Sequence, residues 1–474
     1  MFLFPITFNK SLIVKTKPEF LSSDGGVLTL REIDERLGFS DGLAEKLSDQ
    51  RDKSLIKYSL AELLRTRLFL LAQGWKDEDD ADRLRHDPAV LTAVSKHKGQ
   101  TPLKTDAEDG DSEVLASQPT LSRLIDALAT KTNLKTLNEE LRAITQKSIQ
   151  SICERRFHRV TIDIDSFPLE TYGNQMGSRY NGYYKYDCYH PIVAMLAETG
   201  DILKAELRDG NVHTADGLKD FLFPLIKAVR RSISQSISVR GDAGMPNEEI
   251  LSGLEGKGKN FNVVKYCFRL KTNAVLDRIA APFLELFKKQ PKNDRKEMIV
   301  EFTYRASSWS RKRRVVLVIV DEQGQLEFFK PYNYFFLVAN WTVDEKSGAD
   351  LLEYYRRRGT MERWIGEFKD VLAPSLSCST RPRGENFELE RDDFACNEAL
   401  FLLNALAYNL LNISRRLMEK ATGRGWSLRS FREQVLKAGV RFSLSGRRIL
   451  AWVAAPAAGL WSLLGGAVAN LNPI

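Results

Sequence analysis

A short segment near residue 160 constrains the fold of this 474-residue chain more than any other. Apolar and polar side chains alternate strictly from Val160 to Asp165. This period of two predicts a β-strand with one apolar face, and its polar face carries Asp163 and Asp165. Apolar segments at 191–197, 202–207 and 233–239 predict three more strands, with a helix at 214–230 before the last. The predicted order is therefore strand, strand, strand, helix, strand.

The segments on either side have a different character. The first 150 residues are predicted to be mostly helical, with Ser59 as the N-cap of a helix whose leucines recur at helical spacing. Residues 298–341 are rich in β-branched and aromatic residues, which predicts a β-rich block. Helical patterns follow at 347–372 and 394–417. A β block between helix-bearing stretches indicates an insertion.

Positive charge is concentrated near the C-terminal end. Ten Lys and Arg residues stand against two Glu residues between Leu411 and Arg448, and the rest of the chain is balanced. A localised positive field attracts polyanions because neutralised phosphates release counterions. A solubilising surface explains the same pattern equally well.

Few features indicate a secreted or membrane protein. The five cysteines are far apart and form no C-x-x-C pair, which favours a reducing cytoplasm. Residues 1–8 have no basic segment or cleavage pattern of a signal peptide. The uncharged stretch Ile449–Leu471 is long enough to span a bilayer, but its Gly, Pro and Ala content favours a buried terminal hairpin or helix.

Several carboxylates occupy positions where a metal site could form. Asp163 and Asp165 share one face of a strand, Asp242 directly follows another strand, and Glu362 lies on a later helix. Three carboxylates from separate elements would suit magnesium, and two ions could clamp the oxygens of a phosphodiester. Acidic residues at strand ends also often only cap or solvate them.

A narrow polar stripe surrounds Glu362. In a continuous helix, Tyr355, Arg358, Glu362 and Lys369 fall within an arc of about 60°. Such a stripe could face a specific partner. It could equally be a solvated face with an Arg358–Glu362 pair at i, i+4, and Gly359 could break the helix.

These residues resemble a known signature. Tyr355-x2-Arg358-x3-Glu362-x6-Lys369 is similar to the YREK signature of bacterial insertion-sequence transposases of the DDE type. Asp165 after an apolar strand and Asp242 in RGDAG resemble the first and second acidic positions of that family. The segments 74–88, 117–124, 182–196 and 207–217 resemble one subgroup, so the likeness extends over about residues 20–420.

The resemblance implies an α/β fold with an RNase-H-like catalytic core, in which the first and fourth strands are neighbours. A β-rich insertion would interrupt this core, with a helical N-terminal DNA-binding region before it and a basic C-terminal region after it. The expected boundaries are 1–155 for the N-terminal region, 156–274 and 345–420 for the two parts of the core, 275–344 for the insertion and 421–474 for the C-terminal region.

The resemblance also implies a cut-and-paste DNA transposase. Asp165, Asp242 and Glu362 would be the catalytic metal ligands, with Asp163 as the alternate to Asp165. They would hold two Mg²⁺ ions, for which Mn²⁺ can substitute. The expected partners are double-stranded DNA, both terminal inverted repeats and target, and a second copy of the chain on that DNA. The protein would act in the bacterial cytoplasm, at the nucleoid, and not in a membrane.

By the same resemblance, Tyr355, Arg358 and Lys369 would bind phosphates near the cleavage point. Trp309, beside the basic run Arg311–Arg314, would stack on a displaced base, and its alternative is a core position in a hairpin. Two other functions stay open: a magnesium-dependent nuclease without strand transfer, and an inactive or repurposed DNA-binding derivative.

Overall fold

The computed structural model describes residues 8, 11–15, 19–96, 102–103, 114–153, 157–173, 175–256, 263–290, 297–321, 332–378, 392–445 and 448–471. The chain divides into two compact units. The first consists of residues 1–127 and 410–474, and the second of residues 128–409. The first unit therefore combines the N-terminal helices with the basic C-terminal segment, which we expected as separate regions.

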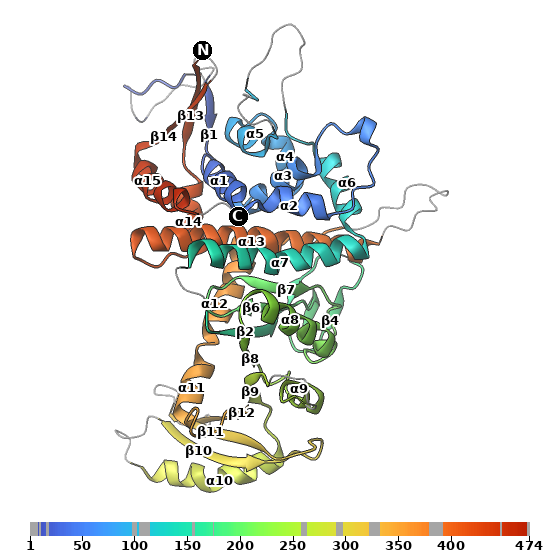
Figure 1. Ribbon diagram of the computed structural model, residues 1–474, viewed down its shortest axis with the longest axis vertical. Helices are drawn as coiled ribbons and strands as arrows, with labels where there is room; N and C mark the ends of the chain where they lie inside the picture. Colours follow the sequence, from blue (N-terminus) through green and yellow to red (C-terminus); the bar gives the residue numbers. More distant parts are fainter. Residues whose placement is uncertain are drawn as a thin grey trace, which may run out of the picture. The chain divides into compact units, whose positions relative to one another are not determined.

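The first unit is mostly helical, and strands from both ends of the sequence pair in it (Figure 1). Strand β1 (Phe20–Ser22) pairs with β13 (Val440–Ser445), which pairs with β14 (Arg448–Val453), all antiparallel. The helices are α1 (Val27–Leu37), α2 (Phe39–Lys46), α3 (Leu60–Gln73), α4 (Asp80–Arg83), α5 (Pro88–Val94), α6 (Gln118–Leu128), the end of α13 (Asp393–Thr422), α14 (Leu428–Phe431) and α15 (Ala455–Ala469).

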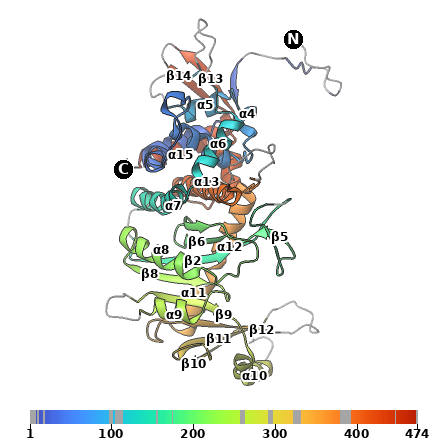
Figure 2. The ribbon, with the colours of Figure 1, turned by 90° about the vertical axis from the view of Figure 1, so that its right-hand side faces the viewer.

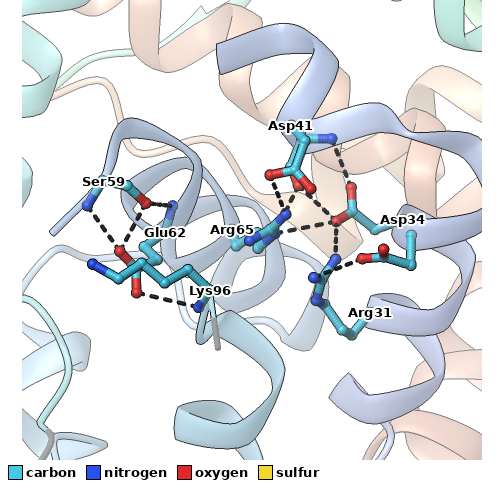
Figure 3. A network of polar contacts seen from close by, with 9 residues as sticks. Arg31, Asp34, Asp41, Ser59, Glu62, Arg65 and Lys96 are labelled. Atoms are coloured by element: carbon cyan, nitrogen blue, oxygen red, sulfur yellow. Dashed lines mark hydrogen bonds and ion pairs between the residues drawn. The ribbon is translucent and has the colours of Figure 1, made fainter. Parts of the chain in front are cut away.

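Helix α3 is anchored by polar contacts at its start and in its middle (Figure 3). The predicted N-cap is confirmed: Ser59 and Glu62 form a reciprocal capping box. One turn further, Arg65 is buried, and its guanidinium contacts Asp34 at the end of α1 and Asp41 in α2. Because a buried charge is costly unless paired, this network fixes the three helices against one another.

The second unit is built on one large mixed sheet, with the strand order β10-β11-β12-β9-β8-β2-β6-β7. Strand β2 pairs in parallel with β8 and antiparallel with β6, so the predicted neighbours are confirmed. The strands are β2 (Arg159–Ser166), β6 (Ile192–Leu196), β7 (Ile202–Glu206), β8 (Ser236–Gly241), β9 (Lys265–Leu270), β10 (Glu297–Tyr304), β11 (Arg313–Asp321) and β12 (Tyr332–Ala339).

Helices cover this sheet, and a buried apolar cluster runs along it from Ile162 on β2 to Val338 on β12. The insertion strands β10 to β12 continue the sheet from β9 and share this core. The helices are α7 (Lys131–Ile152), α8 (Leu218–Ser232), α9 (Glu248–Leu254), α10 (Ala274–Lys289), α11 (Gly348–Arg356), α12 (Gly359–Glu367) and the first part of α13. The expected boundary at residue 155 thus follows α7, which lies within the second unit.

A small separate sheet interrupts the core between β2 and β6. Its strands are β3 (Leu169–Glu170), β4 (Arg179–Asn181) and β5 (Tyr186–Tyr189), in the order β3-β5-β4. The sequence analysis did not predict it, because its strands are too short for a clear alternation. Figure 2 shows it extending outward from the large sheet.

The uncharged stretch at 449–471 forms strand β14 and the 15-residue helix α15. This helix is shorter than the roughly 20 residues that cross a bilayer. By length and composition, α13 could span a membrane, but 89% of its most apolar window is buried inside the protein. A core helix of this kind passes the same test.

Candidate active site

The two candidate aspartates lie at adjoining ends of neighbouring parallel strands. In the pairing of β2 with β8, Asp163 stands opposite Arg240. Asp165 and Asp242 each lie two residues further along, so both carboxylates leave the sheet at the same edge. The backbone holds them locally: Ser166 N donates to Asp165 Oδ1 at 3.0 Å, and Gly244 N donates to Asp242 Oδ1 at 3.0 Å.

Arg358 joins Asp165 to the third carboxylate. Its Nη2 lies 2.6 Å from Asp165 Oδ2, and its Nη1 lies 2.6 Å from Glu362 Oε1. The Arg358 side chain is 8% exposed, whereas that of Glu362 is 61% exposed. One buried guanidinium therefore bridges a carboxylate at the sheet edge and a carboxylate that reaches toward solvent.

The surroundings of Asp165 disfavour negative charge. Burial raises the pKa of Asp165 to about 6, against the lowering effect of Arg358, and the nearby Asp242 and Glu362 raise it further. The three carboxylates are thus close enough to influence one another. Because like charges repel in such a site, it is suited to receive positive charge.

A cavity of about 470 Å³ lies at this site. Asp242 and Glu362 line it, together with Tyr355, Arg358 and Arg269, and Asp165 is joined to it through its ion pair with Arg358. The Tyr355 ring lies 6.4 Å from that of Phe335, and burial raises the pKa of Tyr355 to about 12, so its hydroxyl stays protonated. Lys369 does not line this cavity, and in the described part of the chain its ammonium has no partner. Of the six predicted residues, the structure therefore brings together all except Lys369: Asp165, Asp242, Tyr355, Arg358 and Glu362.

Asp163, the alternate to Asp165, is committed elsewhere. It is fully buried, and its two oxygens accept hydrogen bonds from Arg240 Nε at 2.6 Å and Nη2 at 2.7 Å. Arg240 also donates to the carbonyl of Tyr354 on α11. Because a bidentate arginine occupies both oxygens of this carboxylate, the structure favours Asp165 over Asp163 as the first acidic position.

The helix that carries Glu362 is not continuous. The predicted helix at 347–372 is divided into α11 and α12 by a turn at Arg357–Arg358, followed by a π-helical turn at Phe368–Leu372. Gly359 therefore does begin a new helix, and the 60° arc does not extend to Lys369. The Arg358–Glu362 pair at i, i+4 is still formed, because Arg358 is the N-cap residue of α12 and Glu362 lies one turn into that helix.

Helix α12 is held by the turn between β6 and β7. Gly200 in this turn has φ +77°, and a Cβ there would lie 2.7 Å from the ring of Trp364 on α12. Only glycine allows both this left-handed backbone and the close approach. This turn between β6 and β7 thereby fixes the height of α12 above the sheet.

Trp309 is a core residue in this structure. Its side chain is 4% exposed, its ring lies 5.6 Å from that of Tyr304, and the Arg313 guanidinium lies 5.0 Å from its centroid. A ring enclosed in this way cannot stack on a base, which favours the alternative role. The adjoining basic run is also largely neutralised: Arg313 pairs with Glu248 and Glu255, and Arg314 with Glu301.

The sequence analysis missed several cavity residues, among them Arg356 on α11, Arg269 and Phe335. Arg269 leaves the end of β9, and its guanidinium lies 5.1 Å above the ring of Phe335 on β12. In the sequence, Arg269 was only a lone arginine in the apolar run YCFRL. Phe335 was only one of several aromatic residues in a strand. Neither position is distinctive until β9 and β12 are paired.

The three carboxylates are suitable ligands for a divalent cation, but their present arrangement does not form a metal site. Three carboxylates supply the hard oxygens that magnesium prefers. In the described part of the chain, however, no group of three acidic, His or Cys side chains is arranged to hold a metal ion. The Arg358 guanidinium stands between Asp165 and Glu362, so it would have to withdraw before both could bind one ion.

Comparisons with known proteins identify the family of the chain. One solved structure that resembles the chain is a piggyBac transposase synaptic complex with hairpin DNA, at 11% identity and a TM-score of 0.38, covering 87% of this chain and 79% of that one. No curated protein matches the chain. The family model described as transposase DDE domain group 1 matches residues 4–471. The chain therefore belongs to the DDE transposase family and is a DNA transposase.

Proposed function

We propose that this transposase moves its element by cut and paste, with Asp165, Asp242 and Glu362 as the catalytic carboxylates. The observation that supports the proposal is the convergence of the three residues at one end of the sheet: Asp165 and Asp242 follow adjoining parallel strands, Asp242 and Glu362 line one cavity, and Arg358 pairs with both Asp165 and Glu362. The strands and the helix come from parts of the chain far apart in sequence, so local structure does not explain the convergence.

Transposases of this family use divalent metal ions. We propose Mg²⁺, as two ions with Mn²⁺ as a substitute, held by Asp165, Asp242 and Glu362. When bound, such ions lower the pKa of an attacking water and stabilise the leaving oxygen. The same carboxylates would serve first the cut at the element's end and then the attack of the freed 3′-hydroxyl on target DNA.

The cationic residues of the cavity would bind the substrate. Arg269, Arg356 and Arg358 line it beside Asp242, and phosphate oxygens are the acceptors that guanidinium groups match best. Arg358 would exchange its contacts with Asp165 and Glu362 for a phosphate as DNA enters. The partly buried Tyr355, which keeps its proton, would add a neutral donor. Such contacts position the strand without reading its sequence.

DNA binding beyond the cavity would belong to the first unit. Not all of its basic residues are available for this role: Arg415 pairs with Glu419, and Lys437 lies 2.5 Å from Asp24. Exposed cations along the C-terminal part include Arg424, Arg429 and Arg448. We propose that this unit binds the terminal inverted repeats, that two copies hold the two ends, and that the protein acts in the cytoplasm at the nucleoid.

A metal-dependent cleavage assay tests the proposal. The substrate is a labelled duplex that ends in the element's own terminus, mixed with target DNA in Mg²⁺ or Mn²⁺. Asp242→Asn and Glu362→Gln should bind the duplex normally but lose at least about a hundredfold in cleavage and joining. Glu353→Gln is the matched control, because Glu353 is an exposed carboxylate on α11 that pairs only with Arg357.

Three results would count against the proposal. Normal cleavage by Asp242→Asn or Glu362→Gln would remove the carboxylates from the mechanism. Cleavage by the wild type without any joined product would identify a nuclease. Tight binding without cleavage in either metal would identify a DNA-binding derivative.

A further inference from the structure

The small sheet beside the candidate active site presents an unusual group of exposed tyrosines. Tyr172, Tyr180 and Tyr183 are 79%, 60% and 85% exposed, and Met176 between them is 57% exposed. In the described part of the chain, every largely exposed tyrosine lies in this segment. Clustered apolar exposure of this kind marks an interaction surface more often than chance. We call residues 169–189 the tyrosine hairpin.

The tyrosine hairpin is a built structure and not a loose loop. Its strands β4 and β5 pair from Arg179↔Cys188 to Asn181↔Tyr186. Asn181 Oδ1 accepts from the backbone N of Tyr183 and Tyr184, and its amide donates to the carbonyl of Gly210 at 2.7 Å. Lys185 adopts a left-handed backbone, φ 66°, that closes the turn. The turn depends on backbone contacts, so the Tyr183 ring is free for another use.

A chain of rings connects the hairpin tip with the catalytic carboxylates. The Tyr183 and Tyr184 rings lie 4.9 Å apart, and Tyr184 lies 6.0 Å from the buried ring of His190. Burial raises the pKa of Tyr184 to about 12, and the negative charge of Asp165 contributes to the shift. His190 lies two residues before β6, whose Ile192 and Val193 pair with Ser166 and Asp165 of β2. The rings therefore lead from the hairpin tip to the strands that carry the candidate active site.

Charge does not explain the exposure of the rings. The tyrosine hairpin contains Arg179 and Lys185, balanced by Glu170 and Asp187. A surface without net charge gains little from phosphates, whereas exposed aromatic faces stack on bases of any sequence. Duplex DNA hides its base faces inside the stack, so only unpaired bases can use such a surface.

We propose that the tyrosine hairpin binds unpaired nucleotides of the DNA strand next to the cleavage point, by stacking bases on Tyr183 and its exposed neighbours. This inference rests on the proposed function, because the DNA reaches the hairpin through the carboxylate site. It goes beyond that function by assigning a binding site to a segment with no part in the chemistry. The hairpin would hold the freed end in place between cutting and joining.

Binding to a tailed duplex tests the proposal. The probe is a short labelled duplex that ends in a few unpaired thymines, compared with the same duplex with a blunt end, by fluorescence anisotropy of the full chain in EDTA. Tyr183→Ala should weaken binding of the tailed duplex about tenfold and leave the blunt duplex unchanged. Tyr183→Phe should retain the affinity because the ring remains. Leu286→Ala, on an exposed residue of α10, is the control.

Salt and crosslinking separate stacking from other contacts. The loss in Tyr183→Ala should be the same at low and high salt, because no ion is released when a neutral ring stacks. An iodouracil in the tail should crosslink to the peptide that contains Tyr183. A loss that is equal for blunt and tailed duplexes, or a change in dimer content without a change in affinity, would overturn the proposal; the latter would indicate a surface for a second copy.

The catalytic variants keep the two proposals distinguishable. Asp242→Asn should bind the tailed duplex as the wild type does, even though it fails to cleave. If Tyr183→Ala binds normally, the hairpin proposal is wrong and the carboxylate proposal stands. If Asp242→Asn cleaves normally while Tyr183→Ala binds the tailed duplex more weakly, the carboxylate proposal is wrong and the hairpin proposal stands.

Discussion

Arg358 is the side chain that connects two of the carboxylates in the candidate site. It pairs with Asp165 and Glu362 at 2.6 Å each, and its Nε is buried without a hydrogen-bond partner in the described part of the chain. A guanidinium with one unsatisfied donor is held by its two carboxylates and by little else. It occupies the space that an ion between these carboxylates would need.

Removal of this guanidinium should therefore strengthen metal binding. We expect Arg358→Ala to bind Mn²⁺ several-fold more tightly than the wild type in the absence of DNA, because a competing cation is lost, while cleavage falls. Isothermal titration calorimetry measures the affinity independently of activity. Arg357→Ala is the control, because Arg357 is 69% exposed and pairs with Glu353. Weaker metal binding by Arg358→Ala would show that Arg358 supports the ion instead.

Glu398 makes stability depend on pH. Burial raises its pKa from 4.5 to about 7, and the nearby Glu206 and Asp392 raise it further. The folded state thus holds a proton that the unfolded state releases, so this stabilisation is present below about pH 4.5 and is lost as pH rises through 7. Glu398→Gln should then be more stable than the wild type at about pH 8, by on the order of 2 kcal/mol, and equal to it near pH 4. Urea denaturation at both pH values measures this, and equal stability at pH 8 would contradict it.

The sequence could predict the residues of the site better than their roles. The alternation of β2 pointed to Asp163 and Asp165 together, and the family resemblance favoured Asp165 and Asp242. Asp163 shares the polar face of β2, and nothing local separates it from Asp165. The difference arises from Arg240, which stands opposite Asp163 only once β2 and β8 pair. Burial of Trp309 likewise depends on packing that its sequence neighbours do not reveal.

At the scale of elements, the Asp163–Arg240 pair connects β2, β8 and α11. Arg240 lies on β8, its carboxylate partner lies on β2, and its guanidinium is 4.7 Å from the ring of Tyr354 on α11. The hydroxyl of Tyr354 in turn donates to Ser238 Oγ at 2.9 Å. The pair thereby holds the helix that leads to Glu362 against the strands that lead to Asp165 and Asp242.

Breaking this pair should be costly. Asp163→Ala leaves a buried arginine without its counter-charge, and we expect a loss of about 3–5 kcal/mol in the free energy of unfolding. The double variant Asp163→Leu with Arg240→Leu should recover part of this loss, since no charge remains buried. Chemical denaturation of the three proteins tests both statements. A single variant as stable as the wild type would mean that the pair does not hold these elements together.

The elements themselves were predicted unevenly. The order of β2, β6, β7, α8 and β8 follows from apolar periodicity and is confirmed to within a few residues. The short strands β3 to β5 escaped because a run of two to four residues has no readable period. The break between α11 and α12 was left open, since Gly359 permits but does not require it. Only the packing of Trp364 against Gly200 fixes where the second helix begins.

At the scale of the whole molecule, the first unit depends on close contact between segments far apart in sequence. Gly25 N and Gly26 N donate to the carbonyls of Ala438 and Leu436, both at 3.0 Å. A Cβ on Gly26 would lie 2.2 Å from the Cα of Leu436. Gly26 has an ordinary helical backbone, φ −60°, so space and not conformation requires glycine there. No pattern in the sequence predicts this contact, because its two sides are some four hundred residues apart.

Gly26→Ala should therefore destabilise the first unit and spare the second. We expect faster hydrogen exchange across α1 and β13, with β2 and β8 unchanged, because the C-terminal segment can no longer pack against the N-terminal one. Gly42→Ala is the matched control: Gly42 lies in α2 with nothing within 4 Å of its Cβ position, and alanine there should stabilise the helix by up to about 1 kcal/mol. Equal exchange in Gly26→Ala and the wild type would contradict the expectation.

The pairing of β1 with β13 also sets an order of events during synthesis. The ribosome delivers residues 20–22 first and residues 440–445 after almost the whole chain has emerged. The first unit therefore cannot be completed while the second unit is made, although the second unit can already fold. A prematurely terminated product would then carry the carboxylates without a finished first unit. If that unit binds the terminal repeats as proposed, a broken copy of the protein could not hold the ends that an intact copy binds.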